Sequence, residues 1–405
     1  MPSEPLTLRY MTRFRCLAER CEDTCCSGLR VPVSEAHWQH LRATAAGLTH
    51  LVPNPGGAPS AHAFIEMRPD GHCPYLDAER LCSLQREHGA SLLPEACATF
   101  PRIVSRWGER VEVTGTLACP EVARQCLLAE DAVEPVPGRK DQIPRPEAAR
   151  RLSVDAEDAH GFHAETVRAA ALRLLHRREH PLSSRLAMLG HLAWRLNGRE
   201  ARARAEELLA DTLQRFDSDS AREALHRGFA ALELPGGPGV GLFTSVLKAR
   251  VAAGRGERFS TLVRGVLESL RLSGDEPADL DAAWRTSAER WRHLEALHRE
   301  RVHRYFHNYC LHQLWRSPLI DSPGLLAYVL RLSFRVGLLR LVLAGHPLVA
   351  APGLDSEQLD KAAVETFQLV AKHVEQAPEV LSLTEQLAGA GGAETLGKVL
   401  VFAKF

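Results

Sequence analysis

The sequence predicts a mainly α-helical protein. A small, loop-rich N-terminal domain with a cysteine cluster and a few short strands is followed by a bundle-like α-helical domain. Two observations lead to this fold class. Nine of the ten cysteines in the 405-residue chain lie within the first 126 residues. From about residue 153 onward, apolar residues recur at the i, i+3, i+4 and i+7 spacing of amphipathic helices.

The N-terminal cysteine-rich domain is predicted to span residues 1–128 and to contain short elements joined by loops. Residues 61–67 and 110–117 alternate between apolar and polar side chains, as strands do. Residues 106–109 form a predicted tight turn that makes a hairpin of the chain on either side. Small, loop-rich domains often need a stabilising cross-link such as a bound metal, so the cysteines are expected to bind one.

A proline-rich linker is predicted over residues 129–152, where prolines and charges favour an extended, exposed chain. The α-helical domain is predicted to span residues 153–405. Asp275 or Asp279 is expected to begin its longest helical segment, which runs to Trp315 before prolines break the chain. The other clear amphipathic helices are predicted over residues 163–179, 182–198, 199–216 and 356–376.

Charge and hydropathy argue against two classes of partner. The 50 Lys and Arg residues equal the 50 Asp and Glu residues, so no net field attracts nucleic acid. The most apolar segment, residues 325–343, is interrupted by Arg331, Arg335 and Arg340, which favours a buried soluble helix over a membrane span. Since the first residues also lack the apolar core of a signal peptide, we expect a cytoplasmic protein.

Cytoplasmic thiols stay reduced, so the cysteine cluster indicates a metal site or catalysis before it indicates disulfides. The spacing C-x4-C-x3-C-C of Cys16, Cys21, Cys25 and Cys26 differs from the C-x2-C knuckle of zinc fingers. Thiolates bind both zinc and iron–sulfur clusters, and the number of thiols suffices for one four-iron cluster or two metal sites. A purely structural zinc site stays open as the alternative.

Five stretches of the sequence, taken in order, resemble the pattern of the flagellin lysine-N-methylase family. The same cysteine pattern is shared more loosely with proteins described as zinc- or iron-chelating. The resemblance is dense over residues 8–126 and resumes weakly at residues 305–309, where the family tends to have an Asn-Tyr pair. The stretches are FRCLAERCEDTCCSG (14–28), GHCPYLD (71–77), LCSLQ (81–85), CATFPR (97–102) and CPE (119–121).

The resemblance implies an enzyme that transfers methyl groups from S-adenosylmethionine to lysine side chains of a protein, flagellin or another lysine-bearing protein. It also implies an iron–sulfur cluster, of the 4Fe–4S type, with zinc as the alternative metal. Which four cysteines hold the cluster does not follow from the pattern. The cysteines that match the family are Cys16, Cys21, Cys25, Cys26, Cys73, Cys82, Cys97 and Cys119.

The usual glycine-rich cofactor cradle of methyltransferases is not supported, because the glycine-rich residues 232–243 and 388–397 lie between helical stretches. Arg102, just after Cys97, is the cofactor-binding candidate, since a guanidinium pairs with a carboxylate of a cofactor or of the protein. Residues predicted to be catalytic are Tyr305, Asn308 and Tyr309, which would line a cleft, with Asn308 and Tyr309 binding a cofactor or guiding a lysine amine. Helix packing is the alternative for these three.

Glu22 and Asp23 lie inside the cysteine run and have two interpretations. They form a turn or helix cap beside the metal site, or they accept hydrogen bonds that orient it. A second functional hypothesis treats the whole chain as a non-enzymatic zinc- or iron-binding scaffold for partner proteins. A polar cleft facing the cysteines would favour the enzyme, whereas a closed four-thiolate site would favour the scaffold.

Overall fold

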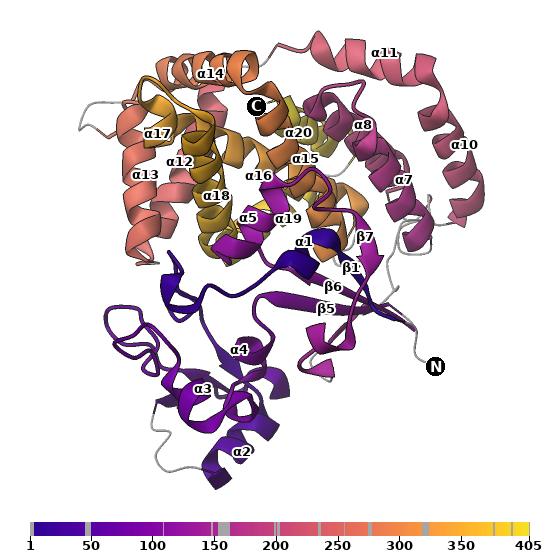
Figure 1. Ribbon diagram of the computed structural model, residues 1–405. Coiled ribbons are helices and arrows are strands. Elements are labelled where there is room, and N and C mark those ends of the chain that lie inside the picture. The colour runs from indigo at the N-terminus through magenta and orange to yellow at the C-terminus, as the bar shows by residue number, and fades with distance from the viewer. Residues whose placement is uncertain are drawn as a thin grey trace.

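The structure is a computed structural model, and its helices and strands confirm the predicted fold class. It describes residues 4–44, 50–107, 109–146, 149–152, 163–197, 200, 203–233, 236–254, 256–273, 278–317, 324–375, 377–389 and 392–404. Figure 1 shows a small lobe at the bottom, a sheet beside it and a large body of helices above.

A five-stranded sheet joins the beginning of the chain to the helical body. Strand β1 pairs in parallel with β6 and antiparallel with β7, so it lies between two strands that come much later in the sequence. The strand order is β7-β1-β6-β5-β8. The strands are β1 (Leu6–Leu8), β5 (Arg102–Trp107), β6 (Arg110–Gly115), β7 (Pro135–Pro137) and β8 (Arg150–Arg151).

The predicted hairpin is present as β5 and β6, which pair antiparallel with Val104 opposite Val113. Branched side chains on this face suit a pleated, half-buried surface. Glu112 of β6 is 2% exposed and accepts two hydrogen bonds from Arg168, at 2.8 and 2.6 Å. The hairpin is thereby tied to the first long helix of the helical body.

The segment predicted as an extended linker contributes β7 and β8 to this sheet. Strand β7 lies at an edge of the sheet and pairs on one side only. The backbone N–H groups that its prolines lack are therefore not needed for a second partner strand. The segment is therefore extended, as expected, but it is paired with the sheet. The predicted domain boundaries stay predictions, and residues 153–162 at the second boundary lie outside the described part of the chain.

A cysteine lobe, defined here as residues 15–100, is built around a second sheet of order β2-β4-β3. Its small core packs Val33, Leu41 and Ile65 against Leu84 and Leu93, separately from the main core. The predicted strand at residues 61–67 is present as β4. The elements of the lobe are β2 (Pro32–Val33), β3 (Leu51–Pro53), β4 (Ala63–Ile65), α2 (Glu35–Thr44), α3 (Ser83–His88) and α4 (Glu95–Thr99).

The helical body surrounds α16, which is buried along almost its whole length and packs against α8, α18 and α20. The core of this body continues into α1 and α5 of the N-terminal region. The helices are α1 (Arg9–Arg13), α5 (Pro120–Leu128), α7 (Ala164–His176), α8 (Leu182–Arg195), α10 (Ala205–Asp217), α11 (Asp219–Ala230), α12 (Gly236–Ala252), α13 (Glu257–Ser269), α14 (Leu280–Leu297), α15 (Arg299–Arg316), α16 (Leu325–Gly345), α17 (Pro347–Ala350), α18 (Ser356–His373), α19 (Pro378–Gly389) and α20 (Gly392–Lys404).

The arginines that interrupt the apolar segment of α16 each have a partner inside the protein. The Arg340 guanidinium lies 4.3 Å from the ring centroid of Trp291, and Arg335 donates to the backbone oxygen of Glu375 at 2.9 Å. Arg331 forms a 3.5 Å ion pair with Glu385. None of the helices in the described ranges has the length and apolar character that crossing a membrane requires.

Two helix starts agree with sequence expectations. Asp279 accepts a hydrogen bond from the Ala282 N–H and begins α14, although the long predicted segment divides at His298 into α14 and α15. Asp355 caps α18 and exchanges hydrogen bonds with Gln358 at 2.8 and 3.0 Å. These caps satisfy N–H groups that the first helical turn leaves without partners.

Replacing Asp355 with alanine is expected to lower the free energy of unfolding by about 1 kcal/mol, because α18 loses its N-terminal cap. Urea denaturation followed by circular dichroism measures this change. Ser356→Ala, one residue further along, is the matched control and should leave stability nearly unchanged. Equal losses in the two variants would contradict a capping role for Asp355.

Candidate functional site

Five cysteines of the lobe line one cavity of about 290 Å³. Backbone pairing brings them together, because the Cys73 N–H donates to the Cys26 carbonyl at 2.7 Å and Leu76 forms a bridge with Cys82. Cys82 stands at the N-cap of α3, and α4 carries another of the five thiols. The cavity is lined by Cys25, Cys26, Cys73, Cys82 and Cys97.

Cys26 is the centre of this thiol group. Its side chain interacts with those of Cys25, Cys73 and Cys82, and these interactions raise its own pKa. The same contacts with Cys26 are the main reason why the pKa values of its three neighbours are lowered. Burial, by contrast, raises the pKa of Cys97 to about 12. The group therefore favours thiolates at three positions, the form in which cysteine binds metals.

The other three predicted ligands lie outside the cavity lining. Cys16 is exposed, Cys21 is half-buried and Cys119 is buried at the N-cap of α5. Burial is the largest cause that raises the pKa of both Cys21 and Cys119. Cys126 and Cys310 are fully buried in the main core.

Within the described residues, no three His, Cys, Asp or Glu side chains are arranged so that they could hold a metal ion as they stand. The thiols nevertheless supply the right chemistry, because several soft sulfur donors share one cavity. The donor set thus fits a thiolate-bound metal or cluster.

Two cationic side chains of the helical body complete the cavity wall. Neither was predicted from the sequence as a site residue. Lys372 of α18 and Arg316 of α15 both line it, and both are buried, with side-chain exposures of 3% and 8%. The charge of Lys372 also contributes to the lowered pKa of Cys25. Single cations on amphipathic helices look like solvated residues in a sequence, so no local pattern marks these two.

Asp23 fastens the cysteine run to α18, which supports the orienting interpretation over that of a simple turn residue. Its carboxylate accepts from Lys372 Nζ at 2.9 and 3.0 Å and from Gln368 Nε2 at 2.7 Å. Lys372 also donates to the Thr24 carbonyl at 3.2 Å. The acidic pair inside the cysteine run was the sequence signal for this contact.

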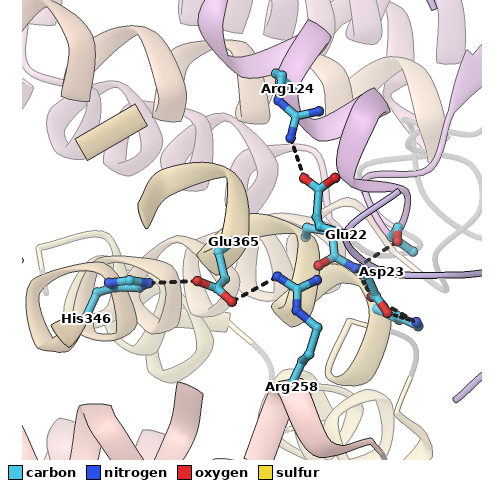
Figure 2. A network of polar contacts seen from close by, with 9 residues as sticks. Glu22, Asp23, Arg124, Arg258, His346 and Glu365 are labelled. Carbon is cyan, nitrogen blue, oxygen red and sulfur yellow. Dashed lines mark hydrogen bonds and ion pairs between the residues drawn. The ribbon is translucent and has the colours of Figure 1, made fainter. Parts of the chain in front are cut away.

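Glu22 makes a second contact with the helical body, to Arg124 of α5. Figure 2 shows Glu22 and Asp23 next to each other, with Arg258 reaching toward them from α13. Arg258 pairs with Glu365 at 3.0 Å, and Glu365 lies 3.4 Å from His346. The hydrogen bond with His346 is the largest cause of a lowered pKa at Glu365, and the charge of Arg258 adds to it.

An acidic pocket of about 430 Å³ opens at this junction. We define it by its four carboxylates, which come from the cysteine run and from α18: Glu22, Glu357, Asp360 and Glu365. Arg124, Arg258 and Lys361 also line it, so the pocket combines both signs of charge. A pocket of this kind suits a ligand that carries a cationic group and hydrogen-bond donors.

The residues predicted to be catalytic lie on α15, buried beneath these pockets. The Tyr305 hydroxyl donates to Asp360 of the acidic pocket, and the Tyr309 hydroxyl donates to Glu375 at 2.6 Å. Asn308 donates to the carbonyls of Cys126 and Ala129, at 2.9 and 2.8 Å, at the end of α5. None of the three lines the thiol cavity or the acidic pocket, and their catalytic role stays a prediction.

Arg102, the predicted cofactor-binding residue, begins β5 next to the cysteine lobe. Its guanidinium lies 5.6 Å from the ring centroid of Phe14, in a cation–π contact. It does not line the thiol cavity, whereas Thr116 and Ala118, which follow β6, do. Its role in cofactor binding likewise stays a prediction.

The contact between Asp23 and Lys372 is expected to be strongly coupled. Both side chains are buried, so removing either partner leaves a charge without compensation. A double-mutant cycle with Asp23→Asn and Lys372→Met should give a coupling energy of about 1–3 kcal/mol in urea denaturation. The exposed pair Arg204–Glu207 is the control and should couple by no more than about 0.5 kcal/mol. Additive effects at Asp23 and Lys372 would contradict the contact.

Comparison with known proteins finds one family model and several relatives. A family model described as the FliB lysine N-methylase C-terminal domain matches residues 168–402. A lysine-N-methylase of Salmonella typhimurium is 28% identical over 136 residues, which cover 31% of this chain and 32% of that protein. The flagellar biosynthetic protein FliU of Salmonella muenchen is 29% identical over 148 residues, covering 35% of this chain and 86% of that protein.

The chain thus aligns with about a third of the length of the curated lysine-N-methylases that it matches. No solved structure matches it. The family model, however, covers more than half of the chain and includes α15 and α18, which carry Arg316 and Lys372 of the thiol cavity. The resemblance predicted from the cysteine stretches is confirmed: the chain belongs to the FliB lysine N-methylase family.

Proposed function

We propose that the protein is a protein-lysine N-methyltransferase that uses S-adenosylmethionine and acts on flagellin or on another lysine-bearing protein. The observation that carries this proposal is the family match over residues 168–402, which contains the helices that wall the thiol cavity and the acidic pocket. Two of the relatives are named lysine-N-methylases, and a third is named a flagellar biosynthetic protein.

The proposal includes an iron–sulfur cluster, with zinc as the alternative metal, held by thiols of the cavity. Cys25, Cys26, Cys73 and Cys82 are the proposed ligands, because they interact with one another and lie beside Cys97 in the same cavity. The metal, when bound, supplies a positive centre that neutralises the thiolates and fastens the loops of the lobe. Cys16, Cys21 and Cys119 have no ligand role in this proposal.

The acidic pocket is the proposed site for the lysine side chain of the protein substrate. S-adenosylmethionine supplies a methyl group on a sulfonium, and lysine must present a neutral amine to receive it. The carboxylates of Glu22 and Asp360 attract the lysine ammonium and accept hydrogen bonds from it. One of them also takes the proton that the nitrogen must lose.

The three α15 residues act in this proposal through neighbouring groups. Tyr305 donates to Asp360 and fixes the orientation of this carboxylate. Asn308 holds the end of α5, the helix from which Arg124 reaches Glu22. Tyr309 binds Glu375, which lies beside Arg316 of the thiol cavity. They are positioning residues, and Arg102 remains the proposed partner of the cofactor carboxylate.

The proposal is tested by anaerobic purification, followed by analysis of iron, sulfide and zinc and by a methyl-transfer assay. Labelled S-adenosylmethionine is supplied with flagellin and, in parallel, with other lysine-bearing proteins, and mass spectrometry locates the methyl groups. Methylated lysines are expected, with a lower rate for Asp360→Asn and an unchanged rate for Glu206→Gln, an exposed glutamate on α10. Stoichiometric zinc without cofactor binding or methyl transfer would instead support the non-enzymatic scaffold.

A further inference from the structure

A further cavity, of about 390 Å³, lies between the edge of the five-stranded sheet and helices α15, α16 and α19. We call it the arginine pocket, because four guanidiniums line it. Glu385 is the only acidic residue in its described lining. The four arginines, which come from β8, α15 and α16, are Arg150, Arg316, Arg331 and Arg335.

Arg316 and Arg335 carry the argument, because both are only 7% exposed. Arg335 donates one hydrogen bond to the backbone oxygen of Glu375, and its Nε is buried without a partner. One terminal nitrogen of Arg316 lies 3.6 Å from Glu375 Oε2, which is an ion pair but not a hydrogen bond, and the buried Nε of Arg316 has no hydrogen-bond partner. Two buried cations therefore share the same glutamate residue.

Only one carboxylate oxygen of that glutamate, Oε2, faces Arg316, because the other accepts from neutral donors. Glu375 Oε1 accepts from the Tyr309 hydroxyl at 2.6 Å and from Gln313 Nε2 at 3.1 Å. A buried charged N–H group without a partner costs on the order of 1–3 kcal/mol or more. The cost is offset if an anion with several acceptor oxygens enters the cavity. Guanidiniums bind phosphate through paired N–H groups, which makes arginine the usual residue for such anions.

We propose that the arginine pocket binds the phosphate group of a small ligand, either inorganic phosphate or a phosphate ester. The volume leaves room beyond a single phosphate, within the range of small-molecule sites. A sulfonium cofactor is disfavoured there by the arginine charges. This site is separate from the proposed lysine pocket and does not depend on the methyltransferase proposal.

Arg316 connects the new site with the thiol cavity, because it lines both. A phosphate in the arginine pocket therefore binds a residue that also forms part of the wall around the cysteines. The ligand would lie next to the candidate metal centre without contacting the cysteines, none of which lines the arginine pocket.

The experiment measures binding of inorganic phosphate to the full chain by isothermal titration, with ionic strength held constant by chloride. Adenosine monophosphate is titrated in parallel as a phosphate ester. Saturable binding is expected, weakened about tenfold or more in Arg335→Gln. Tighter binding of the nucleotide would identify an ester as the ligand, and equal affinity would identify free phosphate.

Two further variants keep the test decisive. Arg331→Gln changes an arginine that is 15% exposed, so the result does not depend on whether Arg335→Gln folds. Arg178→Gln is the matched control, because Arg178 lines a different cavity, formed by the loop between α7 and α8 together with α8 and α15. Phosphate affinity should fall in Arg331→Gln and stay at the wild-type value in Arg178→Gln. Absence of binding, or equal affinity in all variants, would overturn the proposal.

Discussion

Replacing Cys26 with serine is expected to remove the bound metal and to lower lysine methylation at least about a hundredfold, since even outer-shell changes at metal sites cost tenfold to hundredfold. The reason lies in the position of this thiol, which interacts with Cys25, Cys73 and Cys82 at once. Serine keeps the size of the side chain but is a poor ligand for soft metals. Metal analysis and methyl-transfer rates measured on the same preparation check both effects.

Cys16→Ser is the matched control for this variant. Cys16 belongs to the same cysteine run but is exposed and does not line the cavity. Metal content and activity should therefore stay near wild-type values. Loss of metal in Cys16→Ser with retention in Cys26→Ser would show that the ligands come from the other end of the run. The pair of variants thus tests the ligand assignment independently of the nature of the metal.

Acid is expected to destabilise the protein from about pH 6.5 downward through two histidines of α15. Burial lowers the pKa of His307 to about 3, with Arg178 and Arg185 adding to the effect. Burial, followed by the charge of Arg316, moves the pKa of His312 well below its usual value. Below pH 6.5 the unfolded chain binds protons at these residues while the folded protein does not, so stability falls as the pH falls.

His307 loses up to about 1.4 kcal/mol per pH unit, which removes about 2–3 kcal/mol between pH 6.5 and pH 4.5, and His312 adds to this loss in the same direction. This is a large part of the 5–15 kcal/mol typical of folded proteins. Urea denaturation at a series of pH values measures the slope. His312→Gln should reduce the slope, because it removes one of these two groups. A slope unchanged in His312→Gln would contradict the assignment.

The sequence predicted those parts of the fold whose patterns are local. The β5–β6 hairpin follows from alternating residues around a short turn, and the burial of α16 follows from a leucine-rich segment too often charged to cross a membrane. The pairing of β7 and β8 could not be predicted, because two- and three-residue strands carry no period and their partners lie far away in the sequence.

Only the part of the candidate site that consists of cysteines could be predicted from the sequence. Their spacing indicated a metal site, but it did not separate Cys25 and Cys26 from Cys16 and Cys21, since this separation depends on the loop that returns with Cys73. The cationic wall was not predictable, because Lys372 and Arg316 come from helices that lie remote in the sequence and pack there through their apolar faces.

The attachment of the cysteine lobe to the sheet has an evolutionary consequence. The chain leaves the helical body after Phe14 and returns at Arg102, and these two residues contact each other across 5.6 Å. The strands on either side of the excursion, β1 and β5, belong to the same sheet. Inserted modules are tolerated where their two ends lie close together. A module that begins and ends at neighbouring points can be gained, lost or exchanged by recombination without a change in the sheet and the helical body.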